Sequence, residues 1–133
     1  MLTNRKKNIK KNADFLANKR DSWIKKNNYF YSRDRDYMRF LIGEDQKVLE
    51  LGCGIGQLLN SLDPSFGMGV DLSKEMINVA KKNYPNLEFI QGDLEDPELI
   101  ASIDETFDVI ILSDTIGFLD DCQEAFSGLH SLC

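Results

Sequence analysis

Apolar residues near the N-terminus follow the spacing of an amphipathic helix. They recur every three or four positions with Lys and Arg between them: Ile9, Ala13, Leu16, Trp23 and Ile24. This pattern predicts a helix over about residues 8 to 25 with one apolar face. A second helical stretch, rich in aromatic side chains, begins after Asn28 and ends near Gly43. We expect the first helix to lie against the domain or against a partner.

The rest of the chain alternates between short apolar runs and helical patterns. The four apolar runs suit buried strands and cover residues 47–52, 66–71, 87–91 and 107–113. This alternation predicts a parallel sheet flanked by helices. The last run is apolar on both faces and would form an open sheet edge, which proteins usually avoid. We therefore expect a truncated piece of a longer domain, continued by or fused to further C-terminal sequence.

Three helices are predicted to begin at short polar side chains. Ser73 offers a hydroxyl N-cap to the helix after the second strand. Asp96 precedes a proline and suits the cap of a short helix. Asp121 has Glu124 three residues later, as in a capping box, and predicts the start of the last helix.

Composition limits the class of protein. A chain of 133 residues has room for one domain and one core. No apolar run approaches the roughly 20 residues of a membrane span, and the N-terminus lacks the apolar centre of a signal peptide, so we expect a cytoplasmic location. The three cysteines show no Cys-x-x-Cys spacing, which predicts free thiols and no metal site.

Charge is unevenly distributed along the chain. Residues 1–26 hold nine Lys or Arg and two Asp, whereas the whole chain carries a net charge of −6, so the remainder is strongly acidic. An acidic body argues against nucleic acid as a partner. The basic arm could contact nucleic acid, an anionic membrane or an acidic protein, although a solvated basic helix is the simpler interpretation.

The stretch around which the rest is organised runs from Lys47 to Gly56. Its apolar start predicts a strand, and three glycines follow at alternate positions: Gly52, Gly54 and Gly56. Glycine has no Cβ and adopts backbone angles that are closed to other residues. Since a helical pattern begins directly afterwards, the glycines lie between a strand and a helix. This is where α/β folds bind nucleotides.

Polar side chains follow the other strands at the same edge of the predicted sheet. Asp71 lies 19 residues after Gly52, a spacing that suits a carboxylate accepting hydrogen bonds from ribose hydroxyls. Asp93 follows the third strand, and Ser113 and Asp114 follow the fourth. Because the ligand of a parallel sheet lies across the carboxyl ends of its strands, we expect these residues to face one crevice.

These residues resemble the motifs of the S-adenosylmethionine-dependent methyltransferases with a Rossmann-like fold. Four segments carry the likeness in the right order: Glu50–Gly56, Gly69–Ser73, Gly92–Leu94 and Phe107–Ser113 with Asp114. The resemblance covers about residues 29 to 133. It implies an αβα sandwich, incomplete at its C-terminal side, with residues 1–28 as a basic N-terminal helical extension and residues 29–133 as a truncated methyltransferase domain.

The resemblance also implies roles for individual residues toward S-adenosylmethionine. Glu50 would hold the ammonium of the methionine end, Asp71 would bind the ribose, and Asp93 with the Leu94 backbone would receive the adenine. Leu72 and Met76 would pack on the adenine, and Ser113 with Asp114 would border the sulfur. The full cofactor-binding set is Glu50, Gly52, Cys53, Gly54, Gly56, Asp71, Leu72, Met76, Gly92, Asp93, Leu94, Ser113 and Asp114.

The implied activity is methyl transfer to a small-molecule or precursor-linked nucleophile. Many relatives carry a His after the fourth strand where this chain has Phe118, so a general base is in doubt. Asp114, Tyr29 and Tyr31 are the remaining candidates, and the two tyrosines could instead belong to the core. The alternative functions are a non-catalytic nucleoside-binding scaffold and an NAD-dependent oxidoreductase. The latter needs Gly-x-Gly-x-x-Gly, and the sixth position here is Gln57.

Overall fold

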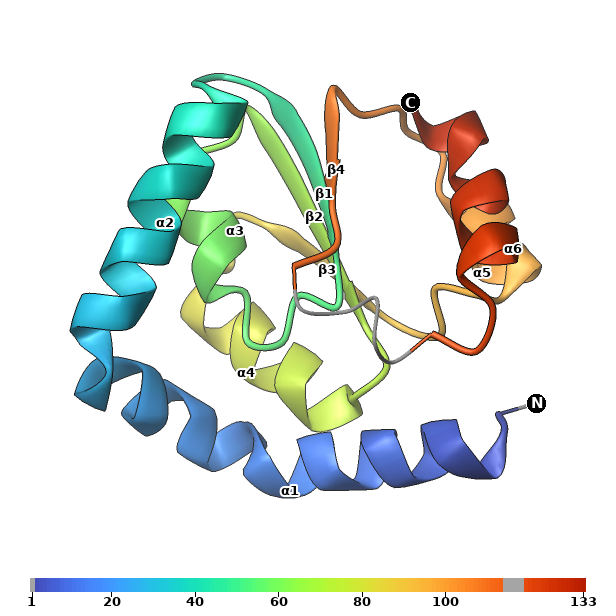
Figure 1. Cartoon of the computed structure of the whole chain (residues 1–133), viewed down its shortest axis with the longest axis horizontal. Helices are drawn as coiled ribbons and strands as arrows, with labels where there is room; N and C mark the ends of the chain where they lie inside the picture. The colour runs from blue at the N-terminus through green and yellow to red at the C-terminus, as the bar shows by residue number, and fades with distance from the viewer. Residues whose placement is uncertain (1, 114–118) are drawn as a thin grey trace.

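A parallel four-stranded sheet in the order β3-β2-β1-β4 forms the centre of the molecule (Figure 1). The structure is a computed structural model that describes residues 2–113 and 119–133. Its strands are β1 (Lys47–Leu51), β2 (Phe66–Asp71), β3 (Glu88–Gln91) and β4 (Val109–Ile111). Its helices are α1 (Asn4–Lys26), α2 (Asn28–Ile42), α3 (Gln57–Ser61), α4 (Lys74–Asn83), α5 (Pro97–Ser102), α6 (Cys122–Gly128) and the short 3-10 helix η2 (Leu129–Leu132).

Strand β1 is central because it pairs in parallel on both sides. Leu49 is the register partner of Met68 in β2 and of Ile110 in β4. With neighbours on both edges and helices on both faces, residues 48–51 are all buried. The run of apolar residues in β1 is the pattern that a strand covered on both faces requires.

Two apolar clusters fill the two faces of the sheet. One joins Leu49, Leu51 and Met68 to side chains from α5 and η2. The other joins Val48 and Phe89 to side chains from α3 and α4. Figure 1 shows α5 and α6 on one side of the sheet and α2, α3 and α4 on the other. The predicted αβα arrangement is therefore confirmed.

Helix α1 runs along the edge of the molecule where the strands end (Figure 1). It begins four residues earlier than the predicted helix because the Thr3 side chain accepts a hydrogen bond from the Lys6 backbone N–H. It packs along α4, where the Asp14 carboxylate accepts hydrogen bonds from the Ser73 hydroxyl and the Glu75 backbone N–H. Ala17 of α1 is buried in this contact.

Helix α2 matches the predicted second helix, but it buries none of its residues. Its aromatic side chains are largely exposed, including Tyr29, Phe30, Tyr37 and Phe40. Met38 and Ile42 pack partly against the cluster that contains Val48. Among the aromatic side chains of α2, Tyr31 is partly buried and packs against the cluster that contains Ile55 and Met76.

The predicted helix starts are confirmed at all three positions. Ser73, Asp96 and Asp121 accept hydrogen bonds from the backbone N–H groups of Met76, Glu98 and Glu124, at 3.1, 3.0 and 3.0 Å. These caps satisfy N–H groups that have no partner within the helix.

The fourth strand is shorter than its apolar run. The Phe107 N–H donates to the Leu132 carbonyl at 2.7 Å, which ties this residue to the C-terminal 3-10 helix instead of to β1. Cys53 is buried, Cys122 partly buried and Cys133 exposed, and no disulfide joins them in the described part of the chain. Across the described part of the chain, no helix combines the length and the apolar character needed to cross a bilayer.

Two glycines with positive φ differ in their surroundings, and this gives a test of packing. At Gly56 (φ 81°) an added Cβ would lie 2.7 Å from Phe89 Cζ, whereas at Gly43 (φ 83°) it would meet no atom within 4 Å. Gly43→Ala should cost about 1–3 kcal/mol of unfolding free energy from backbone strain alone, because its ψ of −172° lies in a region that is essentially limited to glycine. Gly56→Ala should cost about 1–2 kcal/mol from its left-handed backbone and about 1–3 kcal/mol more from overpacking. Urea unfolding measures both, and a loss of about 1 kcal/mol or less in Gly56→Ala would contradict the packing role of Gly56.

Candidate functional site

A cavity of about 620 Å³ lies at the carboxyl ends of the strands, beneath α1. Its wall combines the ends of β1 and β2, the turn after β3 and one face of α1. Its volume lies within the range of small-molecule sites, which is about 300–1,000 Å³. The parallel sheet thus forms a crevice at the edge where α/β folds bind their ligands.

Most of the residues selected from the sequence line this cavity. They are Glu50, Gly52, Cys53, Gly54, Asp71, Leu72, Met76, Gly92, Asp93, Leu94 and Ser113. Gly56 is an exception, because it is buried under the Phe89 ring and is absent from the cavity wall. Its missing Cβ makes room for core packing and not for a ligand. Asp114 and Phe118 lie outside the described residues.

Glu50 is a buried carboxyl group without a full set of partners. It is 3% exposed, and its Oε1 atom has no hydrogen-bond partner among the described residues. Burial, reinforced by the nearby Asp71 carboxylate, raises the pKa of Glu50 to about 8, although a hydrogen bond from the Leu59 backbone acts in the opposite direction. A buried acidic group is unfavourable unless it is paired. Glu50 therefore offers the cavity a strong acceptor for a cationic or hydrogen-bond-donating ligand group.

Asp71 joins the end of β2 to the glycine turn. Its Oδ2 accepts a hydrogen bond from the Gly54 N–H and its Oδ1 accepts one from the Ser73 N–H, each at 2.9 Å. Burial raises the pKa of Asp71, while the two backbone hydrogen bonds act to lower it. Each carboxylate oxygen can accept more than one hydrogen bond, so Asp71 can also bind ligand hydroxyl groups.

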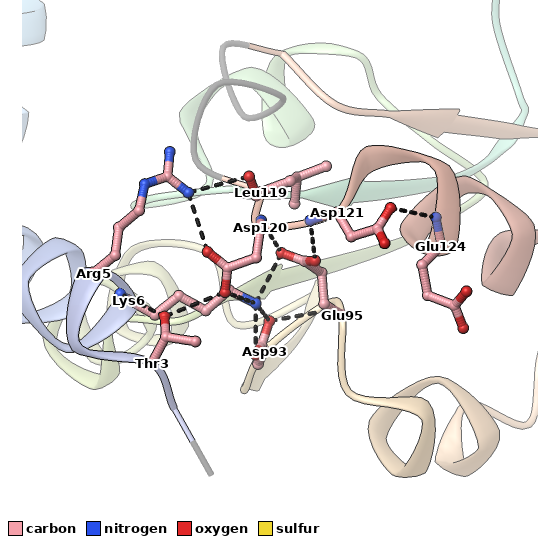
Figure 2. A network of polar contacts seen from close by, with 9 residues as sticks. All are labelled: Thr3, Arg5, Lys6, Asp93, Glu95, Leu119, Asp120, Asp121 and Glu124. Atoms are coloured by element: carbon pink, nitrogen blue, oxygen red, sulfur yellow. Dashed lines mark hydrogen bonds and ion pairs between the residues drawn. The ribbon is translucent and has the colours of Figure 1, made fainter.

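Asp93 is engaged by a lysine from the opposite wall (Figure 2). The Lys6 ammonium lies 2.8 Å from both carboxylate oxygens of Asp93 and 2.8 Å from Glu95 Oε1. Lys6 is only 6% exposed. Burial would lower the pKa of Lys6, but its bonds to Asp93 and Glu95 outweigh burial and raise it. The expectation of a fully solvated basic helix is therefore wrong at this residue.

Helix α1 contributes to the cavity wall, which the sequence patterns did not indicate. The lining residues of α1 are Lys6, Ile9, Asn12, Ala13, Leu16, Arg20 and Ile24. Most of them are three or four residues apart, which places them on one helical face. The apolar members form the predicted packing face. Continuing the same spacing toward the N-terminus reaches Lys6, and Arg20 lies four residues from both Leu16 and Ile24.

The two tyrosines suggested as bases lie in different environments. Tyr31 lines the cavity, and the Arg20 guanidinium lies 5.7 Å from its ring centroid. Tyr29 is 78% exposed and is absent from the cavity wall. Tyr29 therefore lies away from the cavity, because α2 turns its ring to solvent. Within residues 2–113 and 119–133, no three His, Cys, Asp or Glu side chains are grouped to hold a metal ion.

Comparison with protein families places most of the chain within one group. Residues 48–133 match the sequence model of the family described as methyltransferase domain. The match begins in β1 and includes the glycine turn and the strand-end residues Asp71 and Asp93. Helices α1 and α2 both precede the matched residues.

Curated relatives are methyltransferases that are longer than this chain. The malonyl-[acyl-carrier protein] O-methyltransferase of Halalkalibacterium halodurans is 38% identical over 95 residues, which are 66% of this chain and 35% of the relative. The demethylmenaquinone methyltransferase of Chlorobaculum tepidum is 30% identical over 89 residues, which are 65% of this chain and 36% of the relative. The chain thus spans about a third of the length of the relatives that it matches.

Solved structures share the fold. A methyltransferase of Thermotoga maritima, described as a possible histamine N-methyltransferase, superposes with a TM-score of 0.70 at 24% identity, covering 86% of this chain and 52% of that one. Magnesium protoporphyrin IX methyltransferase of Synechocystis gives a TM-score of 0.69 at 16% identity, covering 99% of this chain and 73% of that one. The second likeness extends over α1 and α2.

The raised pKa of Glu50 should make the free energy of unfolding depend on pH. Because the pKa of Glu50 is raised to about 8 in the folded state, folding favours the protonated form, and stability should fall as pH rises from about 4.5 to 8. The Glu50→Gln variant has no ionisable group at this position, so its stability should not fall over this pH range for this reason. We expect the variant to match the parent near pH 5 and to exceed it by about 3–5 kcal/mol near pH 8. Urea unfolding at both values measures the difference, and a pH-independent difference would contradict the assignment.

Proposed function

Because this chain belongs to the methyltransferase domain family, we propose that it binds S-adenosylmethionine in the cavity beneath α1 and catalyses methyl transfer. The acceptor in this proposal is a nucleophile on a small molecule or on a carrier-linked precursor. Two similar proteins, named for malonyl-[acyl-carrier protein] and demethylmenaquinone, support these acceptor classes. The matched relatives are about three times as long as the region that they share with this chain. We therefore make this proposal for the whole protein.

The observation that carries the proposal is the orphaned Oε1 of Glu50 in the cavity wall. The methionine end of the cofactor carries an ammonium group, which would give this buried carboxylate the cationic partner that it lacks. A charge-assisted hydrogen bond of this kind contributes about 1.5–3 kcal/mol. The chemistry of Glu50 therefore fits the amino-acid end of S-adenosylmethionine.

The other strand ends fit the remaining parts of the cofactor. Asp71 would accept hydrogen bonds from the ribose hydroxyls, and Asp93 would accept one from the adenine amino group. Leu72 and Met76 would supply apolar contact to the adenine ring, since both line the cavity. An added Cβ at Gly54 would meet no protein atom within 4 Å, so the backbone there is open to a ligand.

The bound cofactor supplies a methyl group on a positively charged sulfur. The chain's own contribution is to align the acceptor and to exclude water from it. Ile9 and Leu16 of α1 form an apolar part of the wall over the strand ends, which restricts solvent access. Tyr31 is the candidate base that lines the cavity, and no dedicated base is required for this displacement.

Helix α1 would act as part of the cofactor site. Its residues share the cavity with Glu50 and Asp71, so we propose that residues 1–28 complete the binding domain instead of forming a separate extension. The division of the chain at residue 28 stays a prediction from the sequence. The cytoplasmic location also stays a prediction from the sequence.

Calorimetric titration tests the cofactor class. We expect S-adenosylhomocysteine to bind and NAD to bind at least tenfold more weakly. Dinucleotide sites carry Gly-x-Gly-x-x-Gly, and this turn has Gln57 in place of the third glycine. Asp71→Ala should weaken S-adenosylhomocysteine binding by about 10–150-fold, the range of one charged hydrogen bond. Far-ultraviolet circular dichroism should change little.

Asp104→Ala is the matched control, because Asp104 is exposed and lies outside the cavity. Its affinity for S-adenosylhomocysteine should equal that of the parent. Tighter binding of NAD would overturn the proposed cofactor, and an unchanged dissociation constant in Asp71→Ala would overturn the ribose assignment. Methyl transfer to candidate acceptors then separates an enzyme from a binding scaffold, because a scaffold binds the cofactor without turnover.

Proton release provides a second test that follows from the raised pKa of Glu50. At pH 7 the free Glu50 is largely protonated, since its pKa is about 8. An ammonium group placed beside it favours the ionised form, so binding should release up to about one proton. Calorimetry in buffers of different ionisation enthalpy measures this release. Glu50→Gln should release none from this site, and identical buffer dependence in both proteins would contradict the contact.

A further inference from the structure

Lys6 connects three segments that are distant in the sequence (Figure 2). Its ammonium group binds Asp93 and Glu95 after β3, and it lies 3.7 Å from Asp120 Oδ2 in the segment before α6. Glu95 in turn accepts hydrogen bonds from the backbone N–H groups of Asp120 and Asp121, at 2.7 and 2.9 Å. Lys6 is therefore the cation at the centre of three carboxylates.

The hydrogen bonds of Asp93 leave little of its accepting capacity unused. Oδ1 accepts from the Lys6 ammonium at 2.8 Å and from the Glu95 backbone N–H at 3.0 Å. Oδ2 accepts from Lys6 at 2.8 Å, and no second donor to Oδ2 is present among the described residues. A carboxylate oxygen accepts about two hydrogen bonds. One accepting position thus remains, on Oδ2 of a carboxylate that lines the cavity.

A carboxylate held in this way distinguishes purines by the group at position 6. An amino group can donate to Oδ2, whereas an oxo group presents a second acceptor to it and is repelled. This selection depends on the Asp93 carboxylate being held in one orientation, which its two contacts with Lys6 provide. Arg5 also pairs with Asp120, at 3.2 Å, so Lys6 is the cation that lies between Asp93 and Glu95. Without Lys6 these two carboxylates would face each other, and their repulsion would favour rotation of the Asp93 side chain away from Glu95.

We propose that Lys6 is a specificity-determining positioning residue, which holds Asp93 as an oriented acceptor for the amino group of a 6-aminopurine nucleoside. The inference rests on the proposed cofactor site and identifies how its adenine end is selected. Lys6 acts through Asp93 and does not contact the reacting atoms. The N-terminal helix thereby contributes to cofactor choice, and not only to the cavity wall.

The experiment compares two ligands in two proteins. S-adenosylhomocysteine and S-inosylhomocysteine, which has an oxo group at position 6, are titrated into the parent and into Lys6→Met. We expect the parent to prefer the adenosyl compound by about tenfold or more, as one charged hydrogen bond allows. In Lys6→Met this preference should fall by at least threefold. Lys6→Arg should restore much of it, since Arg also donates to carboxylates.

Lys7→Met is the matched control, because Lys7 is the exposed neighbour on the same helix and carries the same charge. It should keep the parent's preference. An equal loss of affinity for both ligands in Lys6→Met would show a merely structural role and overturn the inference. Tighter adenosyl binding in Lys6→Met would overturn it as well, since Lys6 would then compete with the nucleoside. Failure of the parent to bind either ligand would instead overturn the proposed cofactor site.

Discussion

Three carboxyl groups stand at the ends of three adjacent parallel strands, and the need to accommodate them organises the rest of the site. Glu50 lies in β1, Asp71 ends β2, and Asp93 follows β3. A parallel sheet directs the ends of its strands to the same edge, so these groups share one partly buried cavity. Burial raises the pKa of both Glu50 and Asp71, and the proximity of Asp71 raises that of Glu50 further.

The chain gives each carboxyl group a different environment. Asp71 receives two backbone hydrogen bonds, from Gly54 and Ser73, and these also fix the glycine turn against β2. Asp93 receives the buried ammonium of Lys6. Glu50 has no hydrogen-bond partner at Oε1 among the described residues, and burial together with the nearby Asp71 raises its pKa. The site thus combines two carboxylates that already have protein partners with one whose Oε1 has none among the described residues.

Helix α1 joins the site to the uneven charge of the chain. It is the basic part of an otherwise acidic sequence, and one of its lysines lies inside the acidic cavity edge. Conversely, the acidic Asp14 of this basic helix accepts hydrogen bonds from Ser73 and Glu75 at the start of α4. These reciprocal contacts hold α1 across the strand ends. The family match begins at residue 48, so α1 supplies a wall that the matched region alone does not contain.

The sequence by itself determined the order and type of the elements, the helix starts and the identity of the strand-end carboxylates. These features depend on near neighbours along the chain: Ser73, Asp96 and Asp121 cap the helices that directly follow them. The same local signals located most of the residues that line the cavity.

Only the tertiary structure decided which residues from separate elements meet. In the sequence Lys6 looks like one of several solvated lysines, but in the structure α1 crosses the end of β3 and buries it. In the sequence Gly56 looks like a ligand-binding glycine, but in the structure Phe89 occupies the space beside it. Tyr29 and Tyr31 are equivalent in the sequence, but α2 turns the Tyr29 ring to solvent. Periodicity specifies the face of a helix but not the surface on which that face packs, because packing is fixed by contacts between residues far apart in the sequence.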